Sequence, residues 1–437
     1  MRKVISLLLF FSLLVISCQR DKLVSTETEN AKLEHTKASV ATDWYHLQLR
    51  ILLERNSALN GVYFGYIGIG LYESVRYALK NSVSLSTKLD EMPQMPGKEN
   101  NNGYNWEASA NAALAEMVRL FYTGLTTANR TSIDSLEAAY NNKLKPGPGS
   151  AVFQRSQAFG RSIATAVYNW YLTDNLNASN LGYTLPPPVP GAWVPTPPAF
   201  VPLPVNPFIG TAHTYLSTNA TAMAPPFPAP YSEDPASDFY KIVKQVYDVS
   251  KTLTNEQKNI ALFYIDQGNG VGYTPPGHDF SALTQAIETN GVSLADAAEA
   301  YAKAGIAERD ATIVCFRSKY HYNLLRPVTY IRKLIDPSWL PFIVTPPHPE
   351  YPAAHAFITG AVMEAASRVL GDHLSFTDHS YDFRGFPSRS FASLFALAEE
   401  AGISRLYGGI HYLPSINIGL SLGKAMGTTI GDLHLHD

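Results

Sequence analysis

The sequence predicts an all-α protein, a helical bundle with a proline-rich arm wrapped around it. Most of the chain beyond residue 40 repeats apolar residues at spacings of three and four, the period of an amphipathic helix. No segment combines period-two alternation with the turn residues of a β-hairpin. The one long interruption is a proline-dense stretch within residues 181–230, which can form neither a helix nor a central strand.

The N-terminus has the features of an export signal. Residues 1–17 begin with two basic residues and continue as an apolar run too short to span a bilayer comfortably. Cys18 ends a Val-Ile-Ser-Cys sequence that is similar to the lipobox of bacterial lipoproteins, in which this cysteine is acylated; the alternative is an ordinary small residue near a cleavage site. Residues 18–40 are polar and aperiodic, as in a tether. We therefore expect an exported lipoprotein, held at the outer membrane by its lipid anchor only.

Composition excludes several classes of protein. The formal net charge is -3 and no basic run is present, so a nucleic-acid partner is not expected. The two cysteines, Cys18 and Cys315, leave no disulfide framework within one mature chain. Length alone suggests two or three domains, but the helical pattern runs through residues 41–437, which we assign to a single all-α domain. Nothing in the sequence specifies an oligomeric state.

The expected helices follow one another closely on both sides of the proline-rich arm. They cover 43–56, 61–79, 105–125, 130–144 and 153–172 before the arm, and 234–251, 255–268, 279–291, 293–327, 351–371, 390–409 and 416–433 after it. Within the arm, Trp193, Phe200 and Phe208 favour a segment packed on the surface in extended form over a flexible linker, because linkers rarely contain aromatic residues.

Candidate chemistry lies in residues 315–437. Lys319 and Arg326 are seven residues apart, two helical turns, so they would project from nearly the same side of the helix 293–327. Pro327 disfavours helix at Arg326 and places that guanidinium at the helix end. Two cations beside a buried aromatic segment require an anionic partner. A solvated basic face is the alternative for this pair taken alone.

Two further segments complete the candidate site. Pro352 suits the first turn of a helix, so Ala353, Ala354 and His355 would present free backbone N–H groups to an anion at the helix N-terminus. His355 would lean over that anion, or simply cap or pack. Arg405 lies near the end of the next helix, which Gly408 and Gly409 terminate before His411. Three cations, one helix N-terminus and two histidines are the groups that a tetrahedral oxyanion needs.

These three segments resemble a known signature. Lys319-x6-Arg326-Pro327, Pro352-x2-His355 and Ser404-Arg405-x5-His411 follow, in order and spacing, the three-part motif of the vanadium-dependent haloperoxidases and of the type 2 phosphatidic acid phosphatases that share their fold. The surrounding sequence, over about residues 60–437, is similar to the bacterial haloperoxidase-like branch.

The resemblance implies vanadate as the cofactor and a role for each motif residue. Lys319, Arg326, Arg405 and the backbone N–H of Ala354 would bind the vanadate oxygens. His411 would bond to vanadium at its apex, and His355 would act as acid and base while hydrogen peroxide binds. The implied reaction is the oxidation of a halide.

Two alternatives use the same residues. In a phosphatase the site would need no cofactor: phosphate of the substrate would occupy the seat, His411 would attack phosphorus, and His355 would protonate the leaving oxygen. In a surface lipoprotein without effective catalysis, the site would only bind phosphate or vanadate.

The chain departs from the family pattern at two places. Ala353 and Ala354 replace the serine and glycine of the family's Pro-Ser-Gly-His sequence, which removes one hydroxyl donor, and Ser415 stands where an aspartate usually orients the apical histidine. Because a nucleophilic histidine needs that carboxylate more than a metal ligand does, the second departure favours the haloperoxidase. His348 lies on a proline-flanked loop, where it either tunes the site or caps a turn.

Overall fold

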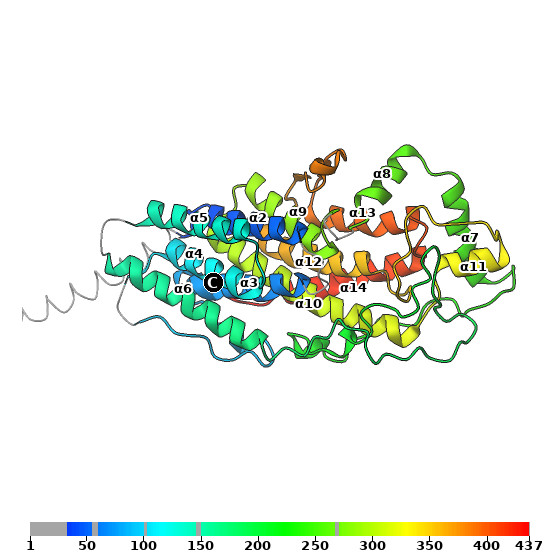
Figure 1. Cartoon of the computed structure of the whole chain (residues 1–437), viewed down its shortest axis with the longest axis horizontal. Helices are drawn as coiled ribbons and strands as arrows, with labels where there is room; N and C mark the ends of the chain where they lie inside the picture. Colours follow the sequence, from blue (N-terminus) through cyan, green and yellow to red (C-terminus); the bar gives the residue numbers. More distant parts are fainter. Residues whose placement is uncertain (1–32, 55–59, 100–102, 146–149, 267–270, 437) are drawn as a thin grey trace, which may run out of the picture.

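The computed structural model describes residues 33–54, 60–99, 103–145, 150–266 and 271–436. This part of the chain is an elongated helical bundle, as predicted (Figure 1). Its α-helices are α2 (Ser39–Leu53), α3 (Asn60–Val75), α4 (Trp106–Phe121), α5 (Thr127–Leu144), α6 (Ala151–Tyr171), α7 (Asp238–Lys251), α8 (Asn255–Phe263), α9 (Pro275–Thr289), α10 (Leu294–Tyr322), α11 (Pro327–Leu334), α12 (Ala354–Leu370), α13 (Leu394–Tyr407) and α14 (Leu413–Gly431).

The N-terminal signal and the lipidation site fall outside the described residues. The expected signal peptide, 1–17, and Cys18 both lie there. The expected tether, 18–40, is too long: Leu33 and Ala38 are buried, and the Ala38 N–H donates to the Val292 carbonyl at 3.1 Å. Across the described ranges, no helix combines the length and the apolar character needed to cross a membrane.

Helix α10 is the axis of the bundle. It packs against α3 on one side and against α12 and α14 on another, and nearly all of its residues are buried (Figure 1). Alanine and glycine dominate its first half, so neighbouring backbones come close: a Cβ on Gly305 would lie 2.6 Å from the Cα of Gly65 in α3. This close packing fixes the position of the residues at the C-terminal end of α10.

Helix α14 holds α12 by a similar contact. A Cβ on Gly423 would lie 2.4 Å from the carbonyl oxygen of Phe357, and one on Gly419 would lie 3.0 Å from that of Ala353. The N-terminus of α12 is therefore seated directly on α14.

The proline-rich arm wraps the body, as expected from its composition. Trp193 is buried and its backbone N–H donates to the Asn323 carbonyl at 2.8 Å, while the backbone N–H of Val205 donates to the Pro347 carbonyl at 2.9 Å. Phe208 is partly buried. Phe200, in contrast, is 58% exposed, so only part of the aromatic argument for packing holds.

The structure corrects three local expectations. Two short antiparallel strands, β1 (Phe376–Asp378) and β2 (Arg389–Phe391), form a hairpin that the sequence did not indicate, because three residues are too few to show alternation. Helix α10 ends at Tyr322, since Asn323 is left-handed with φ of 46°; Arg326 caps α11 instead, so it does not share a helix face with Lys319. Helix α12 begins at Ala354, so Pro352 lies before the helix and not in its first turn, as the sequence had suggested.

The contact between α12 and α14 yields a stability prediction. We expect Gly423→Ala to lower the free energy of unfolding by about 1–3 kcal/mol, because the added methyl group overpacks a backbone contact. Gly97→Ala is the matched control: its nearest neighbour, the Tyr77 hydroxyl, would be 3.7 Å from the new Cβ. Urea denaturation of the two variants measures the difference, and equal midpoints would contradict the prediction.

Candidate active site

Two buried cations, Lys319 and Arg326, lie behind the candidate site. The Lys319 ammonium donates to the carbonyls of Pro349 and Glu350 at 3.0 and 2.8 Å. Arg326 Nε donates to the His348 carbonyl at 2.8 Å and Nη1 to the Ile410 carbonyl at 2.9 Å. Burial lowers the pKa of Lys319 to about 7 and that of Arg326 to about 10. Both cations are therefore held by neutral carbonyls, in surroundings that favour an added anion.

His411 is held in one tautomer. Its Nδ1 lies 2.7 Å from Glu350 Oε1, which also accepts the Tyr412 N–H at 3.0 Å. On the other side of the ring, Arg326 Nη1 donates to Nε2 at 3.0 Å. Arginine has only donors, so Nε2 carries a lone pair and Nδ1 carries the proton that Glu350 accepts. Burial, together with Arg326, Lys319 and Arg405, holds the pKa of His411 well below its usual value.

Glu350 is the orienting carboxylate that the sequence analysis missed. Burial raises its pKa to about 7, against the opposing effect of Lys319 and Arg326. Ser415, which stands where the family usually has the orienting aspartate, is buried beside this carboxylate, and neither its hydroxyl nor Glu350 Oε2 has a well-formed hydrogen bond within the described residues. A signal was present in the sequence: Glu350 is an acid among prolines, five residues before His355.

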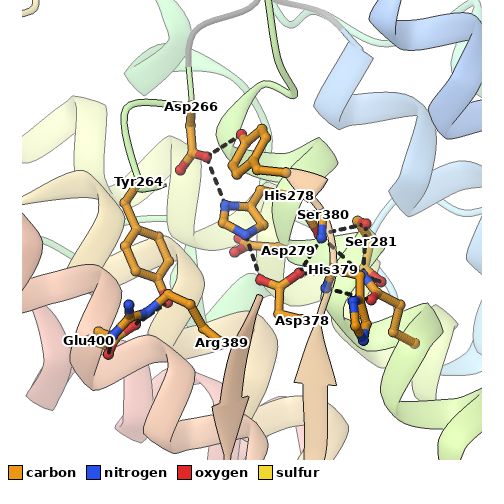
Figure 2. Close-up of polar contacts among 12 residues, drawn as sticks. Tyr264, Asp266, His278, Asp279, Ser281, Asp378, His379, Ser380, Arg389 and Glu400 are labelled. Carbon is orange, nitrogen blue, oxygen red and sulfur yellow. Dashed lines mark hydrogen bonds and ion pairs between the residues drawn. The ribbon is translucent and has the colours of Figure 1, made fainter. Parts of the chain in front are cut away.

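His355 begins a chain of buried acid–histidine contacts. Its Nε2 lies 2.9 Å from Asp266 Oδ2, and Asp266 Oδ1 lies 2.7 Å from His278 Nδ1. His278 Nε2 then lies 2.8 Å from Asp378 Oδ2 on β1; the part of this chain from Asp266 to Asp378 is drawn in Figure 2. Tyr381 also donates to Asp266 Oδ1, at 2.6 Å. The sequence analysis assigned no role to the residues beyond His355, because they lie far apart along the chain.

Charges alternate along this series of side-chain contacts, from Asp266 through His278 to Asp378. Burial opposes the charged forms, but Asp266 and Asp378 outweigh it and hold the pKa of His278 well above its usual value. In turn His278 and His355 hold the pKa of Asp266 well below its usual value, despite burial. Burial and Arg405 lower the pKa of His355 to about 4, so this imidazole is neutral near pH 7.

Arg405 and the start of α12 face the same cavity. Arg405 is buried; its Nη1 donates to the Tyr264 carbonyl, while its Nε has no partner within the described residues. Burial lowers its pKa to about 10. Ala354 and His355 are the first residues of α12, so their N–H groups have no carbonyl within the helix. The unpaired Nε and these N–H groups are the donors that an oxyanion requires.

A cavity of about 510 Å³ joins these groups. Arg405, His411, Ala354, His355 and His348 line it. Lys319 and Arg326 do not line it. Arg326 contacts two residues of its wall, His348 and His411, while Lys319 donates to the carbonyls of Pro349 and Glu350. The site residues expected from the sequence are thus brought together, apart from Ser415, which lies behind Glu350.

His348 lies at the cavity wall. Its Nδ1 is 3.1 Å from Arg326 Nη2, and its ring centroid lies 5.4 Å from that of Phe316. Burial and the neighbouring cations hold its pKa well below the usual value. His321, two residues from Lys319, is exposed and packs against Tyr322.

The donor set fits vanadate or phosphate. Three buried cations, an unpaired arginine N–H and a helix N-terminus favour a tetrahedral anion, and His411 Nε2 offers a lone pair toward its centre. Ala353, where the family has serine, brings no side-chain donor, and its backbone N–H, which was expected to be free, donates to the Ser415 carbonyl at 3.4 Å. The N–H groups of Ala354 and His355 remain for the anion.

Comparisons with known proteins show the family to which the chain belongs. Residues 299–338 and 334–435 match a family model described as the VCPO second helical-bundle domain. The crystal structure of the first bacterial vanadium-dependent iodoperoxidase is 30% identical, with a TM-score of 0.80, and the match covers 92% of this chain and 98% of that chain. The chain therefore belongs to the vanadium haloperoxidase family.

More distant structures share the fold alone. A bacterial vanadium-dependent chloroperoxidase in its apo form is 16% identical with a TM-score of 0.57, covering 85% of this chain and 91% of that chain. A holo form is 15% identical with the same TM-score, covering 89% and 92%. None of the curated protein sequences matches the chain.

The anion site predicts a specific loss of affinity. We expect Arg326→Ala to weaken orthovanadate and phosphate binding by at least about 30-fold, because a buried charged donor is removed. Lys333→Ala removes an exposed cation that pairs with Glu233 and should leave affinity unchanged. Calorimetry measures both, after circular dichroism has shown that the variants are folded.

Arg326→Lys covers the case in which the alanine variant does not fold. It keeps the charge but loses the planar fork that reaches both His348 and Ile410, so its affinity should fall between those of the wild type and the alanine variant. Unchanged affinity in both variants would mean that the anion binds elsewhere.

Proposed function

We propose that the protein is a vanadate-dependent haloperoxidase that oxidises iodide with hydrogen peroxide. The observation that carries this proposal is His411, whose Nε2 lone pair is fixed by Glu350 and surrounded by three buried cations. The choice of iodide rests on the 30% identity to a bacterial iodoperoxidase.

The residues present suit the cofactor. Lys319, Arg326, Arg405 and the Ala354 N–H would hold the oxyanion, and His411 would ligate vanadium through Nε2. Bound vanadate supplies a Lewis-acidic centre that makes hydrogen peroxide susceptible to attack by halide. Arg326 Nη1, now bonded to His411 Nε2, would have to turn from the histidine to the anion.

His355 would move protons at this centre. Its Nε2 is held by Asp266, so the ring keeps one orientation, and Nδ1 has no hydrogen bond within the described structure. Halide oxidation consumes one proton for each hypohalous acid and water formed from peroxide and halide. A neutral imidazole at the cavity wall, supported by a carboxylate, can take and deliver that proton.

One observation also favours the phosphatase. The sequence argument against it was the missing carboxylate, and Glu350 supplies that carboxylate. His411 is thus equipped to act as a nucleophile toward phosphorus and to carry the resulting charge. The same contact weakens the case for a protein that only binds anions, because that case rested on an unsupported histidine.

The test is a pair of assays on the purified protein. With orthovanadate, hydrogen peroxide and iodide, we expect vanadate-dependent formation of triiodide and halogenation of a phenolic dye. An aryl phosphate, assayed without vanadate, should release no phosphate. Phosphate release that vanadate inhibits, with no halide oxidation, would establish the phosphatase instead. Tight anion binding with neither activity would leave a binding protein.

Glu350 and Ser415 should differ sharply in importance. We expect Glu350→Gln to lower vanadate-dependent activity by about 10–100-fold, since a neutral amide supports the basicity of His411 less than a carboxylate does. Ser415→Ala should change activity little, because this hydroxyl does not bond to the histidine. Steady-state rates at saturating vanadate check both variants, and equal losses would contradict the assignment of Glu350.

A further inference from the structure

The cavity extends beyond the oxyanion site to a carboxyl group that the proposed reaction does not use. Glu308 lies on α10 and lines the same cavity as His355, Arg405 and His411. Between Glu308 and Lys319, Thr312 and Phe316 also line it, at helical spacings of four. Since a helix rises 1.5 Å per residue, the wall that α10 contributes extends over about 12 Å from Glu308 to Phe316. The cavity therefore runs along α10 from Phe316, which packs against His348, to Glu308.

Glu308 has an unsatisfied carboxyl oxygen. The side chain is 3% exposed; Oε1 accepts from Thr312 Oγ1 at 3.3 Å, while Oε2 has no partner within the described residues. The adjacent cation, Arg309, is committed to Asp174 through hydrogen bonds of 2.6 and 2.9 Å. Burial raises the pKa of Glu308 to about 7, because its charged form has no counterion. An incoming cation would stabilise that charged form, so this end of the cavity favours one.

A second carboxyl group lies behind the cavity wall. Asp279 on α9 is buried, and its Oδ2 accepts from Thr359 Oγ1 at 3.2 Å; Thr359 itself lines the cavity. Burial raises the pKa of Asp279 well above its usual value, so this carboxyl is neutral near pH 7 and Glu308 is the acid that an incoming cation would meet. The nearby cation His278 is already held between Asp266 and Asp378.

The surroundings favour an organic cation over a metal ion. No group of three or more metal-ligating side chains occurs within the described ranges. The walls between the two ends include Ile209, Phe316 and Ile358. A volume of about 510 Å³ suits a small organic molecule.

We propose that this cavity binds an electron-rich arylalkylamine, with its ammonium group paired to Glu308 and its aromatic ring against Phe316 and Ile358. The inference rests on the proposed function for the reaction of the bound amine, which is halogenation of its ring. In that reaction a ring carbon bonds to the halogen of hypohalous acid, the oxygen–halogen bond breaks, and the displaced ring proton leaves with hydroxide as water. Glu308 is then the residue that selects the halogen acceptor.

Tyramine and 4-ethylphenol test the proposal, because they differ only in the ammonium group. Calorimetry on the full chain without vanadate or peroxide should show tyramine binding at least about tenfold more tightly. Glu308→Gln, which keeps the shape and removes the charge, should bring the two affinities together. Glu364→Gln is the control: Glu364 is a buried glutamate on α12 that does not line the cavity, and the tenfold ratio should persist.

Equal affinities for the two probes in the wild type, or an unchanged ratio in Glu308→Gln, would overturn the proposal. If that variant fails to fold, Glu308→Asp provides a second test: the shorter side chain draws the carboxylate back from the ammonium group, so the ratio should fall. Because binding is measured without cofactor, the binding result does not depend on whether the protein has peroxidase activity. Where halogenation is present, Glu308→Gln should raise KM for tyramine alone and leave kcat unchanged.

Discussion

The buried guanidinium of Arg326 joins the separate parts of the candidate site. It donates to the His348 carbonyl on the loop before α12, and to the Ile410 carbonyl and the His411 ring beyond the end of α13. Its hydrogen-bond partners are neutral, and the carboxylate of Glu350 acts on it from nearby. Lys319 likewise donates to the carbonyls of Pro349 and Glu350. Burial lowers the pKa of both groups, so an added anion would stabilise their charged forms, which is the property an oxyanion site needs.

Two histidines face this anion site, and each is supported by a carboxylate in a different way. Glu350 accepts the Nδ1 proton of His411 and leaves Nε2 as a lone pair, which suits a ligand or a nucleophile. Asp266 is shared between His355 and His278, so its charge is balanced by a second histidine that Asp378 also holds (Figure 2). His355 is therefore fixed in orientation while staying neutral, which suits proton transfer. The different chemical roles come from the partners, not from the histidines themselves.

The bundle also determines the shape of the space around these groups. Helices α10 and α12 run side by side, with α12 packed on α14 (Figure 1). Both α10 and α12 contribute residues to the cavity wall. The proline-rich arm contributes Val205, Asn206 and Ile209 to the wall. A site for a small oxyanion alone would not need a cavity of about 510 Å³, and its acidic far end provides a reason for the additional volume.

The sequence by itself determined the helical class, the wrapping arm, and the three motif segments whose residues meet at the site. These features follow from local rules: helical periodicity, the restrictions of proline, and the spacing of cations and histidines. Tertiary structure decided which acid supports which histidine, because Glu350 and His411 are 61 residues apart and Asp266 and His355 are 89 apart. It also decided that Ser415 is no substitute for the missing aspartate. Contacts over such separations depend on how α10, α12 and α14 pack, and no local pattern in the sequence encodes that packing.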